Sequence, residues 1–266
     1  MLKNLIKYEF KATSRILLPL YGALVLFSII NNLFGARDGL GKTWDNYAFR
    51  FSSIVYSAIM VAIFVMTFVI ILQRFYNNLL QDEGYLMHTL PVTTAQNIWA
   101  KVIVSTVWVI GSGLVSLISV ILLVINVDAI KSAWDGLGKV FEAFIQANKI
   151  AGGHLYIIPL EMILLLIVSI ALGVLVLYAS MCIGHLVPNH RILGSFGGFM
   201  LINIVWDIIV SFVLKSGIVN FSFWNVNNGP YVFELNVLFA ILSQLVISAI
   251  LFIVCNYILE KKLNLE

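Results

Sequence analysis

Residues 53–73, "SIVYSAIMVAIFVMTFVIILQ", decide the fold, because they form an uninterrupted apolar stretch without a charged side chain. A helix of about 20 such residues crosses the hydrocarbon core of a bilayer. The chain is 61% hydrophobic and only 11% charged, which is unlike a soluble domain. The sequence therefore predicts an all-α membrane protein, a single domain over residues 1–266, with six transmembrane helices near the apolar runs 16–34, 53–73, 98–127, 156–182, 192–214 and 235–258.

The lysines and arginines of the short loops predict the orientation of the chain. The largest cluster, Lys3, Lys7, Lys11 and Arg15, lies before the first apolar run. Positively charged loops stay on the cytoplasmic side and the first helix usually dominates, so we expect both termini in the cytoplasm. The same charges are spread too far for a cleavable signal, and we expect this end to remain attached.

Two segments outside the apolar runs have the pattern of amphipathic helices. Residues 1–15 separate lysines from leucines, which suits an N-terminal elbow helix in the inner headgroup layer or a positive flank that only fixes topology. On the outer side, residues 128–154 alternate apolar and charged residues at helical spacing up to Gly152 and Gly153. This predicted outer helix either rests on the outer leaflet or covers an outer vestibule as a lid or partner contact.

Several catalytic or ligand-binding patterns are absent or lack their structural context. "ARDGLGKT" at 36–43 matches a relaxed phosphate-binding loop, but a spanning helix precedes it where a strand is needed, so a glycine-rich turn is predicted. The histidines lack the spacing of a zinc protease, and no G-x-S-x-G is present. A net charge of +3 is too small to indicate nucleic acid. We expect no catalytic residue, metal or cofactor in this chain.

Polar residues inside the apolar runs are candidates for function or for helix packing. Asn203, Asp207, Ser211 and Lys215 recur every four residues, and an acid at bilayer depth is costly. This stripe predicts a wall of a translocation path or a subunit interface, or else an internal hydrogen-bonded strut. A second set predicts a small face for close helix packing: Ser105, Ser112, Ser116 and Ser119. The two cysteines, Cys182 and Cys255, are expected to be reduced, lipid-buried thiols.

A polar island, "QDEGYLMHTLPVTT" at 81–94, separates the second and third apolar runs on the predicted cytoplasmic side. Asp82 and Glu83 favour the start of a short helix, and Pro91 would end it. Such a helix presents an apolar set that suggests a protein partner: Tyr85, Leu86, Met87 and Leu90.

With this segment the chain resembles the ABC-2 type permeases, the membrane subunits of bacterial ABC exporters. The resemblance extends over nearly the whole length, through "LIKYEFKATSR", the six apolar runs, "DEGYLMHTLPVTTAQNIWAK" and "IGHLVPNHRILGS". In that family E-x-G-x, then Leu-Pro-[VL]-[ST], then a lysine opening the next helix, form a coupling helix that docks on the ATPase. Tyr85 departs from the threonine of many relatives. The matching positions are Glu83, Gly84, Leu90, Pro91, Val92, Thr93 and Lys101.

The resemblance implies a non-catalytic permease in the bacterial plasma membrane, working with a cytosolic ABC ATPase dimer that holds ATP and Mg. It implies a second permease, identical or homologous, surrounding membrane lipids, and no nucleic acid partner. The cargo would be hydrophobic or amphipathic: an antimicrobial peptide, an antibiotic or a lipid. The implied docking residues are Asp82, Glu83, Gly84, Tyr85, Leu86, Met87, Leu90, Pro91, His190 and Arg191.

Two other functions are compatible with a chain of this kind. One is a membrane scaffold, immunity or sensor component that does not transport, which an ATPase independent of the chain would indicate. The other is an intramembrane enzyme, which needs a constellation of titratable residues at one depth. In this sequence those residues are in separate loops or alone, which favours the permease.

Overall fold

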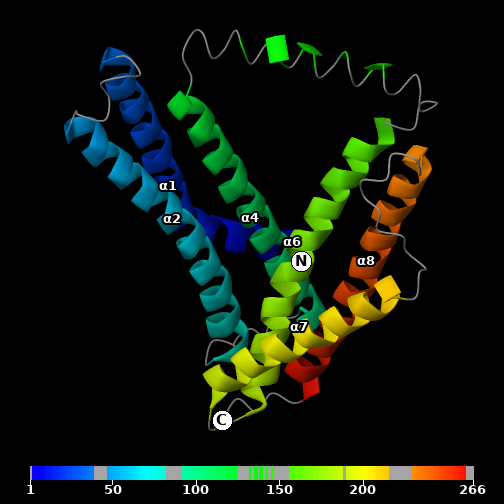
Figure 1. The fold of residues 1–266 in the computed structure, drawn as a ribbon. Coiled ribbons are helices and arrows are strands. Elements are labelled where there is room, and N and C mark those ends of the chain that lie inside the picture. Colours follow the sequence, from blue (N-terminus) through cyan, green and yellow to red (C-terminus); the bar gives the residue numbers. More distant parts are fainter. Residues whose placement is uncertain are drawn as a thin grey trace. The chain divides into compact units, whose positions relative to one another are not determined.

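The computed structural model describes residues 2–38, 47–81, 92–124, 156–187, 190–215 and 229–261, and eight residues between 132 and 146 (Figure 1). Every long regular element within these ranges is helical. Six of these helices are long and apolar enough to cross a membrane. The predictions of an all-α chain and of six spanning helices are confirmed to this extent.

The helices extend several residues beyond the apolar runs that predicted them. Pro91 precedes the fourth element and Pro188 precedes the sixth, in keeping with the exclusion of proline from helix interiors. The elements are α1 (Leu2–Asp38), α2 (Tyr47–Phe75), the π-helical turn η2 (Tyr76–Leu80), α4 (Thr94–Val124), α6 (Ile157–His185), α7 (Arg191–Lys215) and α8 (Gly229–Lys261).

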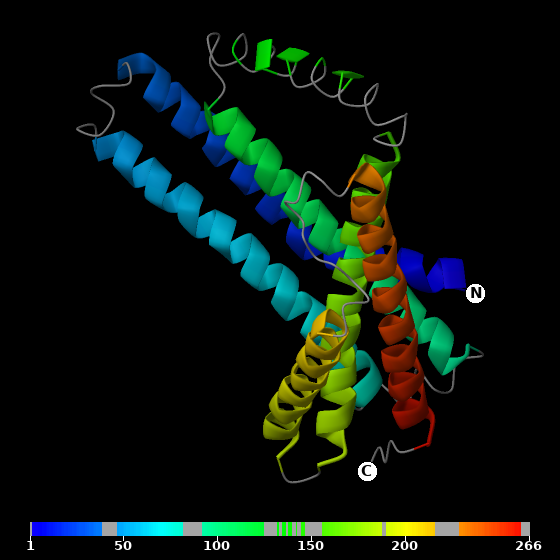
Figure 2. The same cartoon turned by 45° about the vertical axis from the view of Figure 1, so that its right-hand side comes forward.

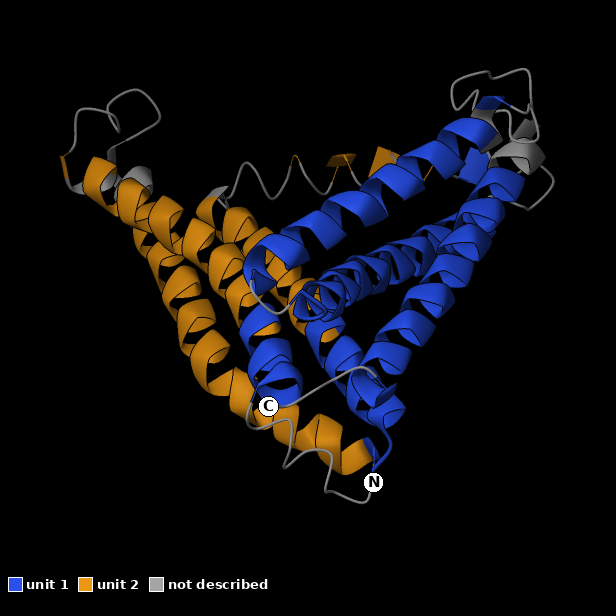
Figure 3. Ribbon diagram, turned by 90° about the horizontal axis from the view of Figure 1, so that it is seen from below, with its two compact units in different colours: residues 1–2, 72–106, 143–266 blue, residues 3–71, 107–142 orange. Residues whose placement is uncertain are grey.

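The chain divides into two compact units, coloured separately in Figure 3. Unit 1 consists of residues 1–2, 72–106 and 143–266, and unit 2 consists of residues 3–71 and 107–142. The divisions fall inside α2 and α4, so each of these helices belongs partly to each unit. The prediction of one domain over the whole chain stays a prediction.

Unit 2 contains α1 beside α2 and the second half of α4 (Figure 2). The Ser112 hydroxyl lies 2.7 Å from the Tyr21 hydroxyl and 2.8 Å from that of Thr67, so one serine links all three helices. The Tyr56 hydroxyl lies 3.0 Å from that of Ser119. Polar side chains placed in hydrocarbon bond across helices in this way. The small face is confirmed as a packing surface, since all four of its serines are buried.

Two asparagines of α1 extend this polar core. The Asn31 Nδ2 group donates to the carbonyl of Ser52 at 3.1 Å, and its Oδ1 accepts from the hydroxyls of Ser52 and Ser53. Asn32 donates to the carbonyl of Leu123 at 3.1 Å. Both amides therefore join α1 to neighbouring helices.

The predicted elbow is continuous with the first spanning helix. Figure 2 shows that α1 changes direction in its N-terminal part, and Pro19 lies inside the helix. Proline has no N–H for the carbonyl of Arg15 and bends helices for this reason. The ring of Phe10 stacks on Trp108 with centroids 4.6 Å apart. The location of residues 1–15 in the headgroup layer stays a prediction.

The predicted outer amphipathic helix is described in part. Residues 132, 135, 136, 138, 139, 142, 145 and 146 are helical. The members of its polar face that are described are exposed, as predicted: Asp135, Lys139, Glu142 and Gln146. Ile145 of the apolar face is half-buried, and Trp134, Leu137, Phe141 and Phe144 lie outside the described residues.

In unit 1, α6 packs against both α7 and α8. Tyr178 on α6 stacks on Phe75 with centroids 3.9 Å apart, and its hydroxyl lies 2.7 Å from that of Ser105. These contacts join the ends of α2 and α4 to α6. Cys182 and Cys255 are free and buried, as predicted, and their sulfurs lie 3.0 Å apart between α6 and α8.

Candidate functional site

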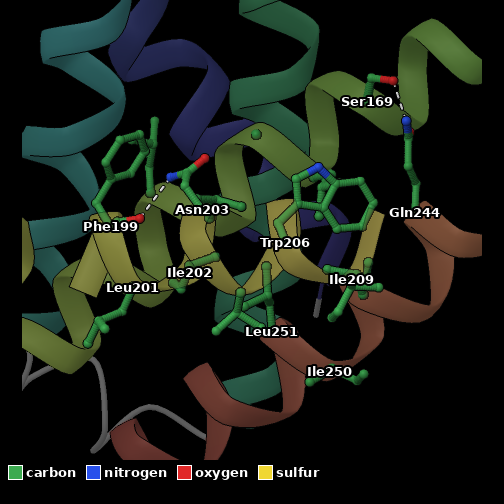
Figure 4. A pocket seen from close by; sticks show the side chains of 16 residues that line it. Ser169, Phe199, Leu201, Ile202, Asn203, Trp206, Ile209, Gln244, Ile250 and Leu251 are labelled. Atoms are coloured by element: carbon green, nitrogen blue, oxygen red, sulfur yellow. Dashed lines mark hydrogen bonds between the residues drawn. The ribbon is translucent and has the colours of Figure 1, made fainter. Parts of the chain in front are cut away.

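A pocket of about 770 Å³ lies between α6, α7 and α8 in unit 1 (Figure 4). Its lining comes from three stretches: between Ser169 and Leu177 on α6, between Phe199 and Ile209 on α7, and between Gln244 and Leu251 on α8. Most of these side chains are aliphatic, and the Trp206 ring adds an aromatic surface. This size and composition are typical of sites for small organic ligands.

Glycines explain why the pocket forms where it does. At one end of the α6–α7 pair the helices touch closely, because a Cβ on Gly184 would lie 2.6 Å from the Cα of Ser195. A Cβ on Gly198 would lie 3.2 Å from the side chain of Ile183. Further along α6, a Cβ on Gly173 would meet nothing within 4 Å. The small residues thus bring the helices together at the turn and leave space at the pocket.

Three polar groups interrupt the apolar lining. The Ser169 hydroxyl donates to Oε1 of Gln244 at 2.9 Å, which leaves the amide NH₂ of that glutamine as a further donor. Nδ2 of Asn203 donates to the carbonyl of Phe199 at 2.8 Å, and its Oδ1 can accept another bond. None of the described side chains that line the pocket is charged. The site can therefore recognise an uncharged hydrogen-bonding group within an apolar ligand.

The predicted stripe on α7 is split by the structure. Asn203 lines the pocket, whereas Asp207 and Ser211 are exposed and do not line it. Four residues advance an α-helix by about 400°, so each member lies about 40° further around the axis than the last. Only 6% of the apolar window of α7 is buried, compared with 28% of that of α6. An exposed Asp207 does not fit the internal strut that was one interpretation of the stripe.

The predicted coupling segment, residues 82–91, lies outside the described residues, but its N-terminal flank is described. The π-helical turn η2 ends at Leu80, which is buried together with Leu79. Nε2 of His185, the last residue of α6, lies 2.7 Å from the Leu80 carbonyl oxygen. The ring of Tyr76 stacks near that imidazole, with centroids 6.4 Å apart. The chain enters the segment from a turn fixed to α6.

The C-terminal flank of the segment is also attached within unit 1. Nζ of Lys101, the residue that matches the lysine of the coupling pattern, donates to the carbonyl of Arg74 at 3.2 Å. Lys101 is buried, so this bond places its ammonium group against the backbone at the end of α2. Trp99 packs beside Phe252 of α8, with centroids 5.0 Å apart.

The second inner turn is described at His190 and Arg191, while Pro188 and Asn189 lie outside the described residues. His190 is exposed, and its carbonyl accepts the N–H of Gly194 at 2.8 Å. Arg191 is half-exposed and begins α7. The predicted helix break between α6 and α7 is confirmed.

Sequence reasoning missed Ser169, Trp206 and Gln244. The usable signal was Gln244, an uncharged amide in the middle of an apolar run, where a polar side chain is costly. No spacing in the sequence could have paired His185 with Leu80, because 105 residues separate them.

Comparisons of the chain with protein-family models, with curated proteins and with solved structures found no match. Within the described residues, no three His, Cys, Asp or Glu side chains gather as a metal-binding group would.

Proposed function

We propose that this chain is the non-catalytic permease subunit of an ATP-driven exporter in the bacterial plasma membrane. The observation that carries the proposal is the attachment of both flanks of segment 82–91 within unit 1, through Leu80 with His185 and Lys101 with Arg74. A segment that receives force from a partner must be fixed to the helices that it moves. The resemblance of the segment to a coupling helix supplies the partner, a cytosolic ATPase dimer with ATP and Mg.

The proposed mechanism is conformational. Closure of the ATPase pair pushes segment 82–91, and the bonds at His185 and Tyr178 transmit that movement to α6. α6 packs on α7 and α8, so the helices around the pocket move with it. Repeated closure and opening alternates access for a hydrophobic or amphipathic cargo.

A second permease, identical or homologous, completes the exporter. The exposed face of α7 is the surface that we assign to it, because Asp207 and Ser211 lie there at bilayer depth. A carboxylate in hydrocarbon requires water or a polar partner. Either a translocation path or a subunit interface on this face supplies one.

The test is to purify the tagged chain in detergent from its native membrane and to identify the proteins that co-purify. We expect an ATPase with the unchanged chain and its loss with Glu83→Arg or Leu86→Asp. Glu142→Arg is the matched control for the first variant, because Glu142 is exposed on the predicted outer helix.

Retention of the ATPase by Glu83→Arg and Leu86→Asp, or its absence from the unchanged chain, would overturn the proposal. An ATPase that co-purifies but hydrolyses ATP at the same rate without the chain would indicate a scaffold or sensor instead.

A further inference from the structure

We infer that the pocket between α6, α7 and α8 binds one uncharged amphipathic molecule from the bilayer, a long hydrocarbon chain that carries a hydroxyl or amide group. This inference deepens the proposed function, since it gives the cargo a chemical class and a first site on the permease. It rests on the proposed function only for the identification of the ligand as cargo.

The size and surroundings of the pocket favour a hydrocarbon occupant. Its volume of about 770 Å³ lies within the range of ligand sites, roughly 300–1,000 Å³. All three lining helices are candidate membrane spans, so the molecules that surround them are lipids. An unfilled apolar pocket of this size forfeits the dispersion contacts of its walls, and a hydrocarbon chain restores them.

The polar groups of the pocket specify the rest of the ligand. The Gln244 amide, whose Oε1 is occupied by Ser169, and the Oδ1 of Asn203 have bonding capacity left. In hydrocarbon, unsatisfied polar groups are costly, and a ligand hydroxyl or amide satisfies them. A charged headgroup is disfavoured, because no described lining residue carries the opposite charge. The chemistry therefore selects fatty alcohols, fatty amides and similar neutral molecules over phospholipid headgroups.

The test uses the full chain, purified in detergent and placed in phosphatidylcholine nanodiscs, with a diazirine-bearing hexadecanol as the probe. We expect photolabelling of residues that line the pocket, located by peptide mass spectrometry. Unlabelled hexadecanol should compete for this labelling at roughly five- to tenfold lower concentration than hexadecane, the effect of one or two hydrogen bonds.

Gly173→Leu fills the pocket, since a side chain there meets nothing within 4 Å. We expect at least a fivefold loss of pocket labelling. Gly22→Leu is the matched control: its position is exposed in unit 2 and equally open. Gln244→Leu keeps the shape of the lining and should remove the preference for hexadecanol over hexadecane while the pocket still accepts hydrocarbon.

Equal competition by hexadecane and hexadecanol, or labelling unchanged by Gly173→Leu, would mean that bulk lipid fills the groove, and the inference would fail. Its failure is separable from that of the exporter. Co-purification of an ATPase without selective labelling leaves the exporter and removes the site, whereas selective labelling without an ATPase does the reverse.

Discussion

The two compact units use opposite means to hold helices together in an apolar solvent. In unit 2, buried hydroxyls and amides of α1, α2 and α4 bond to one another, with Ser112 at the centre. In unit 1, α7 contacts α6 through glycines at one end and then leaves a pocket. Because lipid removes the hydrophobic drive between helices, bonds and close contacts decide which helices stay fixed. The difference identifies unit 2 as the rigid part and the α7 side of unit 1 as the adaptable part.

Gly184→Ala should break the comparison most strongly, because it removes the one close contact of α7. The added methyl overlaps the backbone of Ser195 and forces the helices apart. Overpacking of this kind costs about 2–3 kcal/mol, which lowers Tm by roughly 5–10 °C. Thermal unfolding followed by size-exclusion chromatography measures the shift. Gly173→Ala, with open space at its Cβ, is the control, and equal Tm values for the two variants would contradict the role of the contact.

Ser112→Ala tests the rigid unit. It deletes a hydroxyl shared by Tyr21 and Thr67, and we expect a loss of about 1 kcal/mol in the free energy of unfolding. Unfolding in mixed SDS micelles measures it. Ser57→Ala is the matched control, since that hydroxyl bonds only the Ser53 carbonyl of its own helix and faces outward. A control as damaging as Ser112→Ala would show that the network contributes nothing.

His185→Ala tests the link between α6 and η2. Loss of the bond to the Leu80 carbonyl should raise amide hydrogen exchange in residues 76–80 by roughly fivefold, the effect of about 1 kcal/mol. Hydrogen-exchange mass spectrometry measures it, with His190→Ala, an exposed histidine, as the control. Unchanged exchange in His185→Ala would mean that η2 is held by its buried leucines alone.

Ser169→Ala sharpens the comparison with Ser112→Ala, because the same substitution falls in the adaptable part. The Ser169 hydroxyl is half-buried beside the pocket and has one partner, Gln244. We expect a change below about 0.5 kcal/mol in the same unfolding assay. A loss as large as that of Ser112→Ala would remove the distinction between the two regions.

The six spans could be predicted because each depends on local composition alone. Residues 53–73 are apolar enough to cross a bilayer whatever their neighbours are. The small face of the helix over 98–127 could be predicted for the same reason, as serines recur at helical spacing and become buried. The pairing of these serines with Tyr21, Tyr56 and Thr67 depends on which helices meet, and no local pattern contains that information.

The candidate site could be predicted only in part. Asn203, Asp207 and Ser211 were grouped by their spacing, but the drift of a four-residue repeat separates the pocket-lining Asn203 from the exposed pair. The pocket arises from an absence of side chain at Gly173 and close approach at Gly184, which are properties of a helix pair. The docking role of residues 82–91 stays a prediction.

The π-helical turn makes the length of the chain around Tyr76–Leu80 a property under constraint. A π-helical turn holds an extra residue relative to an α-helix, and such turns concentrate at functional sites. Deletion of one residue here would restore α-helical winding and rotate everything after it by about 100°. The Leu80 carbonyl would then turn away from His185, and segment 82–91 would leave α2 in another direction. In this part of the molecule, a one-residue deletion should therefore be more damaging than most substitutions.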